Sequence, residues 1–336
     1  MKKCEFRSIA IKDIPTMNEL LISRQNFECQ PFPFLKNSCL NAKFITDILV
    51  ELFVVSKGIG IGAFVNDELV GYIMGELKFD NMRGRHAWVP YEGIAIRVDQ
   101  SSELIRNLYA KVSVMWLEQG YFNHYTLIPL GNKFYYEAFQ RLSFFIEQVH
   151  GAMNIDDYIP FEKVSDAEIR TANKMDNEIM GNMSNLISSH QNSAPTFAPA
   201  FPERIMAIKD GYKRLVEDDD ATIFFAVKDM KVLGFQEYEP CDHELMTPDN
   251  GVELCIAGTY PSNMGSGVGK RLMNEGYLIM KEKGYHTMTI DWRIANLTSS
   301  TFWPKCGFKP VAYRMVRCID NNISWANFNN PSIKGL

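Results

Sequence analysis

The feature that most constrains the fold of this chain is an internal repeat with a nearly constant spacing. Three residues, Gly120, Asn132 and Phe144, recur 164 positions later as Gly284, Asn296 and Phe308. Upstream, Gly71 recurs as Gly234 at a spacing of 163. Because ordered matches at one spacing indicate duplicated structural units, and a chain of 336 residues suits two domains, we expect related domains at 1–155 and 156–336.

A further match near the start of each copy has a shorter spacing. Asp13 and Asp166 each precede a helical pattern, and they lie 153 positions apart. We interpret both as N-cap residues, because aspartate accepts hydrogen bonds from the first free amides of a helix. The difference from 164 predicts about ten extra residues early in the second copy, in the proline-rich loop 188–203.

Both copies show the same order of expected elements. A short strand and a helical region come first, followed by an alternating hairpin over 61–77 or 223–239, which we expect to turn at Asn66–Asp67 or Lys228–Asp229. A strand, a helix, a strand, a short helix and a last hairpin follow. This order predicts an α/β (α+β) fold in which each domain has a mixed, mostly antiparallel sheet flanked by helices.

Composition narrows the functional classes. The hydrophobic content is 46% and the charged content is 22%, and both values are typical of a globular protein. A net charge of −5 argues against a nucleic-acid partner, and no apolar run is long enough to span a membrane. Seven scattered cysteines without a CxxC motif favour reduced thiols and a cytoplasmic location. The histidines show no metal-ligand spacing, so we expect no metal.

A glycine-rich loop is the strongest local signal. The stretch SNMGSGVGKRL, Ser262 to Leu272, places Gly265, Gly267 and Gly269 at alternate positions between a predicted strand and a predicted helix. The first amides of a helix lack partners inside the helix, and the helix dipole adds positive potential there. Glycines let an anion approach these amides, so the loop predicts a phosphate site.

Three phosphate-binding patterns can be compared with this loop. A GxxxxGK[ST] pattern fails, because Met264 takes the place of its first glycine and Arg271 that of its last residue. A GxGxxG dinucleotide pattern has the wrong spacing, and only 45 residues follow Asp291, the candidate ribose ligand. The pattern [Q/R]xxGx[G/A], which holds the pyrophosphate of coenzyme A, matches from Met264 to Gly269 except at its first position.

Residues 220–318 resemble the GNAT superfamily of acyl-CoA-dependent N-acetyltransferases. Besides the loop, they carry NLTSSTFWPKCGF, Asn296 to Phe308, which is similar to the family motif Nxx[AS]xxxYxKxGF with Trp303 in place of tyrosine. The resemblance implies a tandem GNAT protein. It would transfer acetyl from acetyl-CoA, its cosubstrate, to a primary amine of a small molecule or peptide by direct attack.

The same resemblance implies roles for particular residues. Those expected to bind acetyl-CoA are Ala257, Gly258, Thr259, Gly265, Ser266, Gly267, Val268, Gly269, Lys270, Asn296 and Ser299. Glu253 would be the general base, with Glu237 and Glu239 as alternatives, and a backbone amide near Gly258 would polarise the thioester carbonyl. Asn296 also suits a helix N-cap. Trp303 has no ionisable proton, so the general acid stays open between Tyr260, Tyr313, water and none.

The first copy departs from the pattern at the glycine positions. Ser101, Glu103 and Ile105 lie 164 positions before the three glycines. A carboxylate at Glu103 would repel phosphates, so we expect a degenerate GNAT-like domain without the pyrophosphate loop, which walls the acceptor cleft or holds a homodimer. A CoA-binding protein without transfer activity is the alternative function, and a dinucleotide-dependent oxidoreductase is a distant third.

Overall fold

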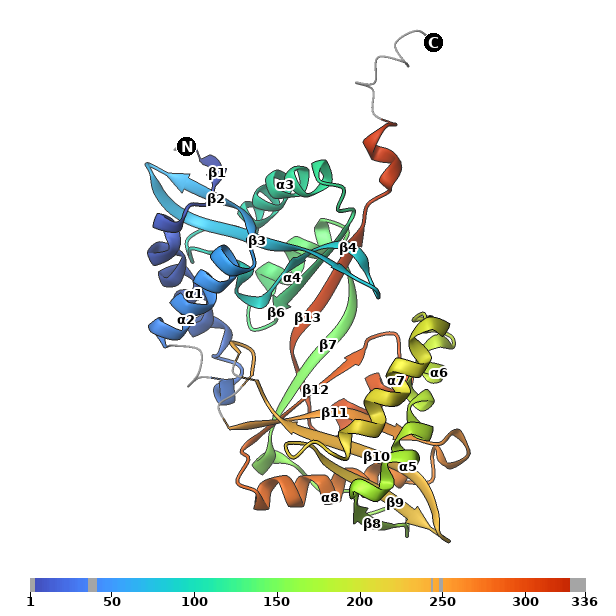
Figure 1. The fold of residues 1–336 in the computed structure, drawn as a ribbon. Coiled ribbons are helices and arrows are strands. Elements are labelled where there is room, and N and C mark those ends of the chain that lie inside the picture. Colours follow the sequence, from blue (N-terminus) through green and yellow to red (C-terminus); the bar gives the residue numbers. More distant parts are fainter. Residues whose placement is uncertain (1–3, 36–40, 243, 248–249, 327–336) are drawn as a thin grey trace. The chain divides into compact units, whose positions relative to one another are not determined.

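The computed structural model describes residues 4–35, 41–242, 244–247 and 250–326. The chain forms two compact units, one from residues 1–148 together with 311–336 and the other from residues 149–310 (Figure 1). Both contain helices and a mixed, mostly antiparallel sheet. The predicted fold class is therefore confirmed. Among the described residues, no helix has both the length and the apolar character needed to cross a bilayer.

The first unit is built around a sheet in the order β1-β2-β3-β4-β6-β13, in which β4 and β6 pair in parallel and the other neighbouring strands, among the described residues, pair antiparallel. The elements of the first copy are β1 (Glu5–Ser8), α1 (Ile14–Glu28), α2 (Ala42–Val50), β2 (Ile59–Val65), β3 (Glu68–Asp80), β4 (Gly84–Val89), β5 (Ile94–Ile96), α3 (Ser102–Glu118), β6 (Asn123–Pro129), α4 (Lys133–Arg141) and β7 (Phe145–Asn154). Helix α3 packs on β2 and β3, where Ile105 and Trp116 are fully buried.

The second unit has the sheet order β7-β12-β11-β10-β9-β8, and β11 pairs with β12 in parallel. The elements of the second copy are β8 (Glu168–Thr171), α5 (Asn177–Met183), α6 (Asn185–Asn192), α7 (Pro202–Leu215), β9 (Thr222–Lys228), β10 (Lys231–Pro240), β11 (Gly251–Thr259), α8 (Val268–Glu282), β12 (Thr287–Arg293), α9 (Leu297–Lys305) and β13 (Lys309–Cys318). Helix α8 packs on β9, β10 and β11, and a separate apolar cluster joins α5 to β9 and β10.

The two copies begin with the same ion pair. Arg7 donates to Asp13 at 3.2 Å, and Arg170 donates to Asp176 at 2.8 Å. The second pair lies 163 positions after the first, residue for residue. Each aspartate is the N-cap residue of the helix that follows, α1 or α5. The expected match of Asp13 with Asp166 is therefore wrong, and so are the extra residues that it implied in the second copy.

The hairpin turns obey the same spacing. Asn66 and Asp67 both have positive φ, 52° and 64°, and so do Asp229 and Met230, with 49° and 59°. Two consecutive residues with positive φ are typical of a type I′ turn, whose twist matches that of paired strands. The second turn thus lies one residue later than the expected Lys228–Asp229, because the repeat aligns Asn66 with Asp229.

The last strand of each copy joins the unit that contains the other copy. Strand β7 begins in the first unit, and its residues 149–154 belong to the second, where the sheet order places β7 beside β12. Strand β13 enters the first unit at Val311 and pairs antiparallel with β6. The units consequently differ from the expected domains at 1–155 and 156–336: the boundary falls after Gln148, and 311–336 belong with the first copy.

Met315 of β13 is fully buried in the core of the first unit, beside residues of α3 and β3. We expect Met315→Ala to lower the free energy of unfolding by about 2–5 kcal/mol, because it leaves a cavity. Urea unfolding followed by tryptophan fluorescence measures the loss. The matched control is Met206→Ala, since Met206 is 66% exposed on α7. A surface substitution of this kind should change stability by less than about 0.5 kcal/mol. Equal effects would contradict the placement of β13.

Candidate active site

Strands β11 and β12 separate part-way along their length. Their parallel pairing covers Gly251 to Glu253 opposite Thr287 to Thr289, whereas β11 continues to Thr259 and β12 to Arg293. Beyond Glu253, β11 keeps its pairing with β10 on one side only. The edge of β11 that carries Ala257, Gly258 and Thr259 can therefore offer backbone groups to a ligand.

The glycine loop connects this edge of β11 to α8. Gly265 and Gly267 have φ values of 80° and 86°, in the left-handed region that only glycine adopts without strain. Gly267 is the N-cap residue of α8, and its carbonyl accepts a 3.0 Å bond from the amide of Arg271. The amides of Val268, Gly269 and Lys270 precede that bond, so they lie in the first helical turn, where no helical carbonyl can accept from them.

The surroundings of the three loop glycines differ in how much room they leave for a side chain. A Cβ on Gly267 would lie 2.8 Å from the backbone nitrogen of Ser165, so a side chain there meets main chain. A Cβ on Gly265 would have no atom within 4 Å, and one on Gly269 would come no nearer than 3.6 Å, to the ring of Phe302. Gly267 is thus required by its backbone conformation and by its neighbours, and Gly265 by its conformation alone, whereas a methyl group at Gly269 would make only ordinary contacts.

Two expected CoA-binding residues have structural partners within the protein. The Ser266 hydroxyl donates to the carbonyl of Asn263 at 2.7 Å and so stabilises the loop. Asn296 is buried and is the N-cap residue of α9, where its side chain accepts from the Ser299 amide at 3.2 Å. Its Oδ1 also lies 3.1 Å from Nε2 of His190 on α6, a residue that sequence reasoning did not single out.

Trp303 lies inside an aromatic group near the end of α9. Its ring is 4.8 Å from that of Phe302 and 6.0 Å from that of Phe308, measured between centroids, and the residue is buried. Cys306, three residues later, is also buried, and burial raises the pKa of its thiol to about 12. Both side chains therefore pack, and Cys306 is unreactive as a nucleophile near neutral pH.

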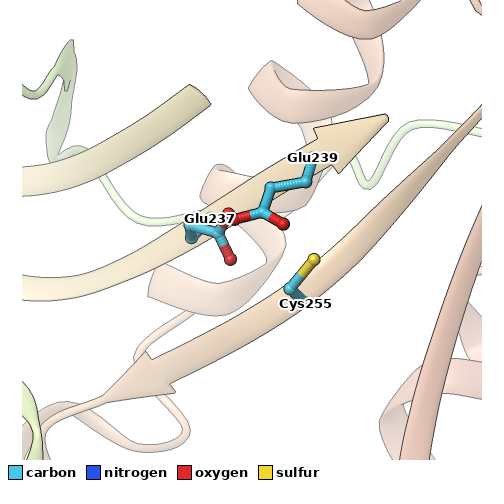
Figure 2. A group of neighbouring side chains, drawn as sticks. All are labelled: Glu237, Glu239 and Cys255. Carbon is cyan, nitrogen blue, oxygen red and sulfur yellow. The ribbon is translucent and has the colours of Figure 1, made fainter. Parts of the chain in front are cut away.

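A group of acidic side chains gathers on β10 and β11. The register between these strands shifts after Glu237, so that Cys255 is an extra residue on β11, as in a β-bulge. Figure 2 shows the carboxyl groups of Glu237 and Glu239 beside the thiol of Cys255 on the neighbouring strand; the potential ligand atoms of the three all lie within 4.8 Å of one another. Glu237 is fully buried, and neither of its carboxylate oxygens has a partner at hydrogen-bonding geometry.

Burial and mutual repulsion raise the pKa values of these carboxyl groups. The pKa of Glu237 rises to about 8, mainly through burial and then through the charge of Glu239. The pKa of Glu253 rises to about 7, again mainly through burial and then through the charges of Asp291 and Glu244. A carboxylate with a pKa near neutrality is suited to general base catalysis at neutral pH, because it both binds and releases protons there.

Residues 187–308 match the family model described as acetyltransferase (GNAT) family. The chain carries a GNAT domain. The loop, the separated strands and the α9 motif all lie in the matched region. The GNAT resemblance predicted from the sequence is thereby confirmed in the second copy. A comparison with curated proteins found no match.

Solved structures similar to this chain include a tandem GNAT protein. That protein, from the clavulanic acid biosynthesis pathway, is similar over 94% of this chain and 97% of that chain, with a TM-score of 0.51 and 12% identity. A GCN5-related N-acetyltransferase from Sphaerobacter thermophilus is similar over 94% and 95%, with a TM-score of 0.58 and 10% identity. At such identities the likeness shows a shared fold and no shared substrate.

A third structure is part of a larger protein. A glucosamine N-acetyltransferase region in a fungal multi-domain GH3 β-N-acetylglucosaminidase is similar over 94% of this chain, with a TM-score of 0.58 and 11% identity. The chain spans only 38% of that protein's length. The activity of the whole fungal protein therefore says nothing direct about this GNAT domain.

Most of the expected site residues of the GNAT domain lie at three places: the free edge of β11, the amides at the start of α8, and the start of α9. Glu253 lies in the paired part of β11, and Trp303 lies near the end of α9. Sequence reasoning found the glycine loop through its spacing, and it named Glu237, Glu239 and Glu253. It missed Cys255, because no residue pattern reveals the bulge that brings this thiol to the two glutamates.

Gly267 and Gly269 should respond differently to an added methyl group. We expect Gly267→Ala to destabilise the GNAT domain by about 1–3 kcal/mol through left-handed strain, to which the contact with Ser165 adds. Gly269→Ala is the matched control. It should be neutral or stabilise by up to about 1 kcal/mol, because alanine favours the helix. Thermal unfolding measures both, and a larger loss in Gly269→Ala would contradict this loop geometry.

Proposed function

We propose that the protein is an N-acetyltransferase that moves an acetyl group from acetyl-CoA to a primary amine by direct attack. The observation that carries the proposal is the row of free amides at Val268, Gly269 and Lys270, directly beside the free edge of β11. The amides suit a pyrophosphate, and the free strand edge suits an extended chain with a thioester at its end. The match of residues 187–308 to an acetyltransferase family supports this assignment.

The loop residues fit the pyrophosphate of CoA. The amides of the first turn of α8 would hold its oxygens, and the helix dipole and Lys270 would add positive charge. Gly265 and Gly269 keep the approach open. Acetyl-CoA supplies the activated acyl group as a thioester. We assign the backbone from Ala257 to Thr259 to the acyl end, with an amide at Gly258 that polarises the carbonyl oxygen.

Glu253 is our candidate for the general base. An amine that arrives as an ammonium must lose a proton before it attacks, and the Glu253 carboxylate, whose pKa is raised to about 7, can accept that proton. Trp303 takes the place of the family's tyrosine but offers no ionisable proton. The thiol of CoA should have a pKa close to that of cysteine, about 8.5, so the thiolate can leave without an acid. We therefore assign Trp303 to packing.

The first copy should not bind CoA. Glu103 stands at the position of Gly267, and its carboxylate accepts bonds from Arg106, at 2.6 Å, and from Arg141. Ile105, at the position of Gly269, is fully buried in the core of the first unit. A carboxylate at the entrance and an apolar side chain inside exclude a pyrophosphate from this helix start. We propose that this copy is a degenerate GNAT-like domain.

Trp303 also favours a second candidate function, a CoA-binding protein without transfer activity. Turnover separates the two functions. Release of free thiol from acetyl-CoA in the presence of a broad panel of amines would support the transferase. Tight CoA binding without thiol release for any amine would favour the second candidate.

Acetyl-CoA should stabilise the protein, because its site exists only in the folded state. At 100 times its dissociation constant, the expected rise in Tm is roughly 5–10 °C. Gly269→Glu should abolish the rise, since its carboxylate would face the pyrophosphate, while the helix tolerates glutamate in its first turn. Gly211→Glu is the matched control, because a Cβ on Gly211 in α7 meets nothing within 4 Å. An unchanged rise in Gly269→Glu would place the ligand elsewhere.

The pH profile should report the general base. Burial and neighbouring charges raise the pKa of Glu253 to about 7. Because the carboxylate must be deprotonated to accept a proton, kcat/KM should fall about tenfold per pH unit below that value. Glu253→Gln should lower kcat by about 10²–10⁴-fold and keep the Tm rise with acetyl-CoA. If instead Glu237→Gln removes the acidic limb and Glu253→Gln keeps it, the base is Glu237.

A further inference from the structure

The acidic group around Glu253 is larger than one proton transfer requires. It comprises Glu237 and Glu239 on β10, Asp242 and Glu244 after β10, Glu253 on β11 and Asp291 on β12. After burial, the strongest influences on the Glu253 carboxyl are the charges of four of these residues, all negative. Within the described parts of the chain, none of the six forms an ion pair with a basic side chain. We call these six residues the acidic subsite.

A second observation concerns the buried member of this subsite. Glu237 is fully buried, and among the described residues neither of its oxygens has a partner at hydrogen-bonding geometry; besides burial, the side chains that influence its pKa are Glu239, Cys255 and Glu253, all within the same group. Its carboxyl group lies beside Glu239 and Cys255 (Figure 2). Burying an unpaired carboxyl group is costly, and proteins normally satisfy such groups with a hydrogen bond or a counter-ion. A bound cation would supply both.

The reacting amine cannot be that cation throughout the reaction. Its ammonium gives one proton to Glu253, which passes it to water, and the amine nitrogen then forms the C–N bond. The C–S bond breaks, the thiolate leaves with the bonding electrons, and the second proton that the nitrogen loses goes to the thiolate or, through Glu253, to water. The acetylated nitrogen is a neutral amide and no longer balances any carboxylate. Any cation that stays in the subsite throughout the reaction must therefore be another group of the acceptor.

Resting on the proposed function, we propose that the acidic subsite binds a second cationic group of the acceptor, so that the substrate is a diamine or a longer polyamine cation. Negative groups on three strands and on the segment after β10 suit an extended cation better than a point ion. Burial and then the charge of Glu237 raise the pKa of Tyr212 on α7, so this aromatic side chain lies within electrostatic range of the carboxyl group. Such a ring suits an ammonium group of a polyamine.

The test compares diamines of three to eight carbons with monoamines of the same length and with the matching amino acids. At saturating acetyl-CoA, we expect kcat/KM for the best diamine to exceed that of its monoamine at least tenfold, through a lower KM. The amino acids should be poorer than the monoamines, because their carboxylates face the acidic subsite. If the diamine and the monoamine have equal kcat/KM values, the inference is overturned and the transferase assignment still stands.

Variants locate the second cation. In Glu239→Gln, the ratio of kcat/KM for the diamine to that for the monoamine should fall toward one. Glu282→Gln is the matched control, since Glu282 is exposed in the last turn of α8, outside the acidic subsite, and this variant should keep the ratio. A ratio unchanged in Glu239→Gln and in Glu237→Gln would overturn the assignment.

Binding of the diamine without acetyl-CoA, followed by calorimetry on the full chain, separates the inference from the proposed function. Binding that weakens in Glu239→Gln, without turnover of any amine, would support the subsite and refute the transferase. The neighbouring thiol allows one further control. If zinc alone raises Tm in the wild type and not in Cys255→Ser, the cluster is a metal site and the polyamine assignment falls.

Discussion

The parting of two parallel strands is the constraint on which the rest of the second unit depends. While β11 and β12 stay paired, from Gly251 to Glu253, their backbone groups satisfy each other. Once they separate, the inner edge of β11 needs other partners, and it leads without interruption into a loop whose next amides are also free. The same parting places Glu253 at the fork, where its carboxyl group is half-buried and surrounded by other acids. The free edge of β11, the amides of the loop and the position of Glu253 all follow from this one change in strand pairing.

Much of this could be predicted from sequence because the responsible signals are local. Positive φ at Gly265 and Gly267 is required by the path of the loop, and glycine is the residue that permits it. The helix that follows needs an apolar face at helical spacing, and α8 provides one. The repeat fixed the fold class, since two copies of one element order must build two similar sheets. The mistaken partner of Asp13 came from a match on one residue; the ion pair with an arginine six positions earlier, shared by Arg170 and Asp176, is the signal that identifies the true partner.

Other features have no local signal. The repeat does not predict whether β13 pairs within its own copy or with β6 of the first copy. Strands β7 and β13 occupy equivalent positions in the two copies, so both pairings agree with the repeat. Only tertiary pairing decides between them. The burial of Glu237 is also a tertiary property, since an alternating strand with glutamates reads as a solvated edge. Its unpartnered carboxyl group illustrates a general rule: local preference fails most where a site must hold something that the chain does not contain.

The route of β13 has a consequence for how the chain folds as it is made. Strand β6 ends at Pro129, and its neighbour β13 is complete only at Cys318. At about 5–20 residues per second, the ribosome needs roughly 10–40 s to synthesise the intervening chain. Throughout that time the first copy has an open strand edge at β6, the kind of surface that recruits foreign strands. The N-terminal copy is thus synthesised first but completed last, and its folding on the ribosome depends on whatever protects that edge until the final strand arrives.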